Sequence, residues 1–202
     1  MAEMLTSLTR TVTAGVILAA LLFILYYFTQ GYSGADFGPF FFRWLHVVSG
    51  VMWIGLLWYF NFVQIPSMPK IPDEQKPAVA KVIAPAALFW FRWGAMATII
   101  TGLILAWMNG YLGEAIILGL GNLGEAYVAQ HTAIGIGMWL GAIMWFNVWF
   151  VIWPNQRKAL GMVEAAAEEK TKAARIAMLF SRTNTLLSIP MLFAMSAAQN
   201  LY

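Results

Sequence analysis

Five long apolar runs constrain this chain more than any other feature of its sequence. The hydrocarbon core of a bilayer is about 30 Å thick, and about 20 apolar residues in a helix cross it. Every backbone polar group in lipid must find a partner, and apolar runs of this length satisfy that condition as helices. We therefore expect an all-α, polytopic membrane protein with five transmembrane helices. They span about residues 12–28, 40–64, 86–108, 129–153 and 177–198.

The composition agrees with a chain dissolved in a bilayer. Hydrophobic residues make up 61% and charged residues 10% of the 202 residues, whereas a soluble domain carries about 25% charged residues. A globule with so few charges could not cover its surface in water, and we expect one transmembrane domain over residues 1–202. The sequence has no cysteine, which excludes disulfides, thiolate metal sites and covalently attached haem c within it.

The positive charges predict an orientation. Eleven of the twelve Lys and Arg residues lie at the amino terminus, around the loop between the second and third runs, or around the loop between the fourth and fifth. The other side carries only Arg43. Because cytoplasmic loops are enriched in Lys and Arg, we expect a cytoplasmic amino terminus and an external carboxyl terminus. The net charge of +3 is then explained by Lys and Arg residues on the cytoplasmic side. We therefore expect no nucleic-acid partner.

The two longest connections differ in character. Residues 155–176 are rich in Ala, Glu and Lys, which favours a solvated cytoplasmic helix that extends the fifth span. Residues 109–128 contain five Gly, two Glu and no cation. We expect an external loop there, with a short helix that could cap the space between the spans.

An internal repeat relates the second and fourth runs. The second contains His46 and Gly50, and the fourth contains His131 and Gly135, with the same four-residue spacing. Both runs continue through Met-Trp-aliphatic-Gly and Phe-Asn to a proline. We interpret this as a parallel repeat, in which helices 2 and 3 correspond to helices 4 and 5.

The matched histidines predict a shared haem b. Each glycine lies one helical turn from its histidine on the same face, and so leaves room for a flat macrocycle. We expect His46 and His131 as axial ligands of the haem iron, each with an acceptor for its other ring nitrogen. Gly50 and Gly135 complete the expected cofactor site.

Three other interpretations of the polar residues stay open. A buried histidine can simply hydrogen-bond to a backbone carbonyl, and a copper site with Met52 or Met138 is a minor alternative to haem. Arg92 and Arg182 could bind an anionic head group or a haem propionate, or simply snorkel to the interface. The polar run at residues 181–185 suggests that the fifth helix packs inward.

Longer motifs resemble a known family. The stretches are RWLHVVSGVMWIGLLWYFNFVQIPSMPKIP, IAPAALFWFRWGAMAT, FNVWFVIWPNQRKALG and SRTNTLLSIPMLF. Over about residues 40–200 they resemble the membrane domain of the bacterial membrane-bound urate hydroxylases, the urate oxidase N-terminal domain family. The resemblance implies oxidation of urate to 5-hydroxyisourate, with electrons leaving to an external c-type cytochrome.

Two departures from that family bear on the expected activity. Thr183 stands where we expect a histidine in cytochrome-fused members. The chain also carries no cytochrome domain, so we expect a short form whose c-type haem comes from a separate partner. By chemistry alone, Asn61 and Asn147 are candidates for holding the purine oxygens of urate.

Two classes of function follow. The first is a haem b redox protein that passes electrons to an external c-type cytochrome; whether it is itself an enzyme stays open. The alternative is a cofactor-free accessory subunit of a larger respiratory or oxygenase complex. A transporter is disfavoured, because no span carries an Asp, Glu or Lys near its middle. Five helices bury a limited interior, so we expect a homo-oligomer or a complex subunit.

Overall fold

The computed structural model describes residues 5–31, 33–122 and 128–202. Within them the regular elements are helices, and no strand occurs. Five helical stretches are long and apolar enough to cross a membrane, judged by length and composition. They are Leu8–Thr29, Ala35–Lys70, Lys76–Met108, Ala129–Ala159 and Ala167–Asn200. The all-α class and the five membrane-length helices are thus confirmed, whereas the repeat and the orientation stay predictions.

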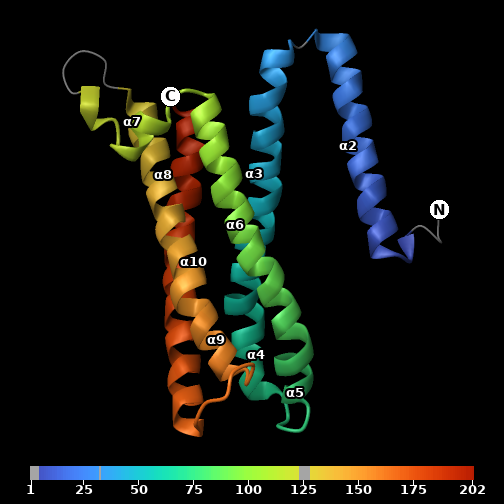
Figure 1. Ribbon diagram of the computed structural model, residues 1–202, viewed down its shortest axis with the longest axis vertical. Coiled ribbons are helices and arrows are strands. Elements are labelled where there is room, and N and C mark those ends of the chain that lie inside the picture. The colour runs from blue at the N-terminus through green and yellow to red at the C-terminus, as the bar shows by residue number, and fades with distance from the viewer. Residues whose placement is uncertain (1–4, 32, 123–127) are drawn as a thin grey trace. The chain divides into compact units, whose positions relative to one another are not determined.

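The described elements follow one another as helices joined by short turns (Figure 1). The long α-helices are α2 (Leu8–Gln30), α3 (Gly34–Trp58), α6 (Ala84–Met108), α8 (Ala129–Phe146) and α10 (Ala167–Asn200). Short α-helices are α4 (Ile65–Ser67), α5 (Lys76–Ala78), α7 (Leu112–Ile116) and α9 (Trp153–Ala159). The π-helices are η1 (Tyr59–Gln64), η3 (Val79–Ile83) and η5 (Asn147–Ile152), and the 3-10 helices are η2 (Met68–Lys70) and η4 (Leu120–Asn122).

The helices extend beyond the apolar runs that predicted them. Helix α10 begins ten residues before the expected span, in a segment rich in the strong helix formers Ala, Glu and Lys. The expected helical extension of the fifth span is thereby confirmed for residues 167–176, whereas 155–159 belong to α9, which continues the fourth span, and 160–166 are not helical. The expected short helix of the loop at 109–128 is α7, although residues 123–127 of that loop lie outside the described residues.

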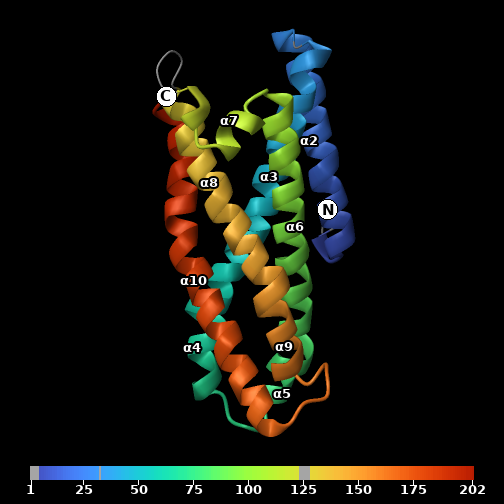
Figure 2. The same cartoon turned by 60° about the vertical axis from the view of Figure 1, so that its left-hand side comes forward.

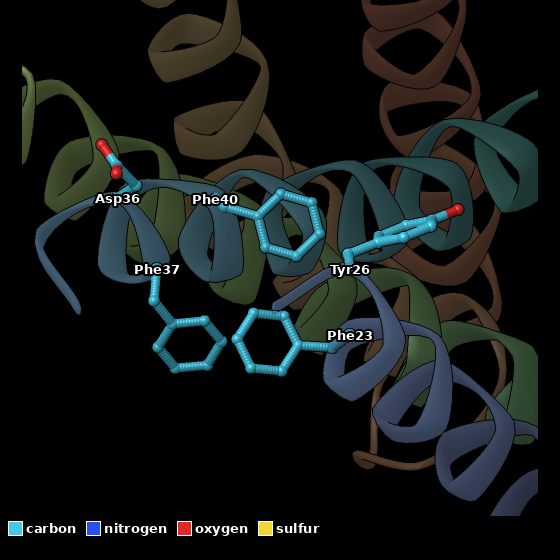
Figure 3. Close-up of a pocket in the computed structure, with 5 residues that line it drawn as sticks. All are labelled: Phe23, Tyr26, Asp36, Phe37 and Phe40. Carbon is cyan, nitrogen blue, oxygen red and sulfur yellow. The ribbon is translucent and has the colours of Figure 1, made fainter. Parts of the chain in front are cut away.

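The chain divides into two compact units, residues 1–41 and 42–202, and each is described by itself. In the first unit, α2 ends at Gly31, whose φ of 68° is the left-handed conformation of a helix C-cap. At the start of the next helix the Ser33 hydroxyl and backbone N–H donate to the Asp36 carboxylate at 2.6 and 3.2 Å. Aromatic rings then pack across the turn, with the Phe23 and Phe37 centroids 4.3 Å apart (Figure 3).

The second unit is a bundle in which α8 and α10 lie side by side, and α6 packs on α8 (Figure 2). Its core holds large side chains that are almost fully buried: Trp53, Leu57, Phe91, Met144 and Val148. Helix α7 lies at the end of this bundle where α10 finishes, and α9 lies at the other end.

Two of the π-helical segments occupy similar places. η1 follows α3 and η5 follows α8, so each comes after the helix that carries one of the two histidines. Asn61 lies inside η1, and Asn147 begins η5. A π-helical turn holds an extra residue and is frequent near functional sites. Here the wider turns set which side chains of each helix face α10.

A large cavity beside His46

A cavity of about 970 Å³ lies within residues 42–202 and is lined by α3, α6, α8 and α10. Its walls are mainly apolar and carry four tryptophans and three methionines. These are Trp53, Trp58, Trp139, Trp145, Met138, Met191 and Met195. Pockets for cofactors and small molecules have volumes of about 300–1,000 Å³ and are mostly apolar with a few fixed polar groups. This cavity therefore has the size and lining of a binding site for a large apolar ligand.

His46 is the imidazole on this cavity, and its orientation is fixed by α6. Its Nδ1 lies 2.9 Å from the backbone carbonyl oxygen of Thr98. A carbonyl can only accept, so Nδ1 carries the proton and donates it. The neutral ring then keeps a free lone pair on Nε2, which is the arrangement that a metal-ligating histidine needs.

A glycine of α6 makes room for this ring. A Cβ built on Gly102 would lie 2.8 Å from Cε1 of His46 and 2.9 Å from Nδ1. No side chain larger than hydrogen fits at 102 while the imidazole keeps its place. Gly50 also lines the cavity, and a Cβ there would meet only the Thr98 methyl at 3.9 Å.

His131 and Gly135 lie at the α7 end of the bundle and are not among the residues that line the cavity. The His131 ring stacks near the Tyr111 ring, with centroids 6.2 Å apart and planes inclined by 26°. A Cβ on Gly135 would clash with the backbone carbonyl oxygen of Ala115 in α7. Gly135 thus allows α7 to approach α8 closely. The structure brings His46 and Gly50 to the cavity, and it brings His131 and Gly135 to the packing of α7.

One end of the cavity is polar. Arg43, Tyr111, Gln199 and Asn200 line it there, and Arg43 Nη1 donates to Gln199 Oε1 at 2.7 Å. Burial raises the pKa of the Tyr111 hydroxyl, and the positive charge of Arg43 opposes that shift. This end can therefore hold a carboxylate or a polar ring edge, while the rest of the cavity holds an apolar body.

Two further donors on the cavity wall have no partner. The indole nitrogens of Trp53 and Trp145 are buried without a hydrogen bond, although Trp53 is only 1% exposed. Buried polar groups in native proteins are nearly always paired. These two N–H groups are enclosed by protein atoms and do not open onto the cavity.

Asn61 and Asn147 do not line the cavity, because both are bonded to α10. Asn61 Nδ2 donates to Ser181 Oγ at 2.8 Å, and Asn147 Nδ2 donates to Asn184 Oδ1 at 2.8 Å. Asn184 in turn donates to the Met144 carbonyl at 2.9 Å and is fully buried. The inward packing of the polar run at 181–185 is confirmed for Ser181 and Asn184, which hold helices together.

The sequence patterns did not predict the polar end of the cavity. Arg43 is the one cation on its side of the predicted topology and precedes His46 by three residues, so it shares a helix face with the imidazole. That signal could have drawn attention to it. Gln199 and Asn200 lie at the far end of the chain, and no sequence pattern joins them to Arg43.

The fold and the cavity define a class: an all-helical protein with five helices long and apolar enough to cross a membrane and a large, mainly apolar cavity among them. Within the chain, residues 115–200 match the family model described as "Urate oxidase N-terminal". The match covers less than half of the chain, and it agrees with the resemblance of the sequence motifs to that family. No curated protein and no solved structure matches the chain.

Proposed function

We propose that this protein is a membrane-embedded haem b redox protein, similar in role to the membrane-bound urate hydroxylases. The observation that supports this proposal most directly concerns His46. Its Nδ1 donates to the backbone carbonyl of Thr98 at 2.9 Å, and its Nε2 has no hydrogen-bond partner among the described residues. A haem b would supply one-electron transfer at this position. The family match at residues 115–200 supports the urate-related part of the proposal.

The cavity residues fit a haem in two respects. The volume of about 970 Å³ and the Trp and Met lining suit a large flat macrocycle. His46 would hold the iron through Nε2. His131 does not line the cavity, so His46 is the histidine that we propose as the ligand.

The urate-oxidising form of this proposal places the substrate at the polar end. Oxidation of urate to 5-hydroxyisourate takes an oxygen from water and releases two electrons and two protons. Arg43 would hold the urate anion, and the amides of Gln199 and Asn200 would bind its ring oxygens. The electrons would leave through the haem to a c-type cytochrome on the external side of a bacterial inner membrane.

A reduced-minus-oxidised absorption spectrum of the purified protein tests the haem. We expect a b-type band in the wild type and its loss in His46→Ala. The matched variant, His131→Ala, should keep the band, because His131 contacts Tyr111 rather than the cavity. Loss of the band in both variants would instead support the paired ligation that the repeat predicts. No band in freshly isolated wild type would reject the haem.

A second test separates urate chemistry from haem binding. Urate added without oxygen should reduce the haem in the wild type and should reduce it more slowly in Arg43→Gln. A haem that is bound but does not respond to urate would leave the redox role standing and reject urate as the donor.

The alternative is a cofactor-free accessory subunit, as part of a larger complex or a homo-oligomer. The specific observation in its favour is the position of His131 outside the cavity, which leaves the cavity with one imidazole. The apolar walls could then hold lipid chains. A colourless protein that copurifies with a respiratory or oxygenase complex would favour this function.

A further inference from the structure

A cluster of cations and indoles lies at the α9 end of the bundle, remote from α7 (Figure 1). The guanidinium carbon of Arg92 in α6 lies 3.7 Å from the centroid of the Trp153 ring and 5.2 Å from that of Trp149. The guanidinium carbon of Arg157 lies 5.9 Å from the same Trp153 ring. Two positive charges therefore share one aromatic ring.

The local fold explains this arrangement. Trp149 lies in η5 and Trp153 begins α9, four residues later, so successive turns of one continuous helix present both rings on one side. Arg157 follows after four more residues. Pro154 at the start of α9 donates no backbone hydrogen bond and is tolerated there. Helix α6 packs against η5, which brings Arg92 over the rings.

The cluster has donors without acceptors. Arg92 Nε, Arg92 Nη1 and Trp149 Nε1 are buried, and none of them has a hydrogen-bond partner. Within the described residues a salt bridge joins Lys76 to Asp73 in another part of the chain, and none joins a carboxylate to Arg92 or Arg157. A partly buried guanidinium with no counter-charge raises the free energy of the folded state. The positive charge of Arg157 nearby raises it further by electrostatic repulsion of Arg92.

We infer that this cluster binds a phosphate oxyanion. An oxyanion supplies the negative charge that the neighbouring guanidinium groups of Arg92 and Arg157 lack, and it can reach the exposed Arg157. Guanidinium groups bind phosphate through paired, charge-assisted hydrogen bonds. The phosphate could belong to an anionic phospholipid head group or be free in solution. This site is separate from the haem proposal, because it shares no residue with the large cavity.

Native mass spectrometry of the purified protein in neutral detergent tests the site. Phosphatidylglycerol is the probe, and diacylglycerol, which has the same acyl chains without a phosphate, is its comparison. We expect the wild type to retain one phosphatidylglycerol more tightly than diacylglycerol. Inorganic phosphate at constant ionic strength then distinguishes the source: displacement of the lipid shows that the oxyanion alone is recognised, and no displacement shows that the lipid is required.

Charge variants locate the binding. Arg92→Gln and Arg157→Gln should each weaken phosphatidylglycerol binding by about tenfold or more, the size expected for losing one charge-assisted hydrogen bond. Lys158→Gln removes the same charge from the same helix and should bind as the wild type does. Arg157 is exposed, so its variant remains testable if Arg92→Gln fails to fold. Equal binding of the two lipids to the wild type, or equal loss in Lys158→Gln, would overturn the proposal.

Discussion

The imidazole Nδ1 of His46 lies 2.9 Å from the backbone carbonyl oxygen of Thr98, a residue 52 positions away on the neighbouring helix. This contact joins α3 to α6 through a main-chain group, which no side-chain substitution at 98 can remove directly. It fixes both the ring's orientation and its tautomer. Gly102 of α6 makes room for this ring.

Replacing Gly102 by alanine should displace the His46 ring. The added Cβ would lie 2.8 Å from Cε1, so the imidazole or the helix must move. We expect a loss of about 1–3 kcal/mol in unfolding free energy, as for other overpacked sites. Thermal unfolding in detergent measures this, and the haem spectrum reports the ring's position. Gly50→Ala is the control for the unfolding measurement, because its Cβ meets an atom only at 3.9 Å; equal destabilisation by both variants would contradict the explanation.

Replacing Gly135 by alanine should loosen α7 from α8. The new methyl would clash with the Ala115 carbonyl, and a main-chain atom cannot swing aside as a side chain can. Faster hydrogen exchange at residues 112–116 would report the loosening. Gly141→Ala on the same helix has nothing within 4 Å of its Cβ and should leave exchange in α7 unchanged. Unaltered exchange in the Gly135 variant would reject this role.

Replacing Asn184 by leucine should destabilise the bundle. It removes the acceptor of Asn147 and the donor to the Met144 carbonyl, both in a buried place. Hydrogen bonds between membrane helices are worth about 0.6 kcal/mol on average and up to about 1.7, so we expect a loss in that range. A double-mutant cycle with Asn147→Leu checks it. The two losses should be less than additive, and strict additivity would show that the pair does not interact.

Tyr111 should make the protein sensitive to alkaline pH. Burial raises the pKa of its hydroxyl in the folded state, so the neutral form is favoured on folding. Its stabilising contribution is therefore present below the ordinary tyrosine pKa of about 10 and is lost as the pH rises through the folded-state pKa. Tyr111→Phe should weaken this alkaline loss of stability. Arg43→Gln should raise the Tyr111 pKa further, seen in the phenolate absorbance; a fall would contradict the proximity of the two groups.

The five helices could be predicted because lipid leaves the backbone few choices, so length and hydropathy are enough. Their full lengths could not, since polar flanks such as the start of α10 are helical for reasons that hydropathy does not measure. The repeat motif singled out His46, which the structure places on the wall of the large cavity. The contacts of His46 with Thr98 and Gly102 could not be predicted, because nothing in the sequence of an apolar helix shows which residues of α6 face α3.

The spacing of His131 and Gly135 matches that of His46 and Gly50, but the first pair does not line the cavity. Equal spacing in two helices predicts equal positions only if their neighbours are also equal. Helix α8 has α7 folded against its start, and Gly135 meets the carbonyl of Ala115 there. Glycine that makes room for a ligand and glycine that makes room for a backbone look the same in a sequence.

The amides of Asn61 and Asn147 both end on α10, and this bears on how the chain is made. Helices enter the bilayer in chain order, so these two side chains reach lipid before Ser181 and Asn184 are synthesised. Asn61 Nδ2 also donates to the Leu57 carbonyl of its own helix at 2.9 Å, so this amide has one partner before α10 arrives. The Asn147 amide takes its partner from α10, and until then it lies in an apolar solvent where unpaired polar atoms are costly. The last helix thus pairs the amide of Asn147 and gives that of Asn61 a second acceptor.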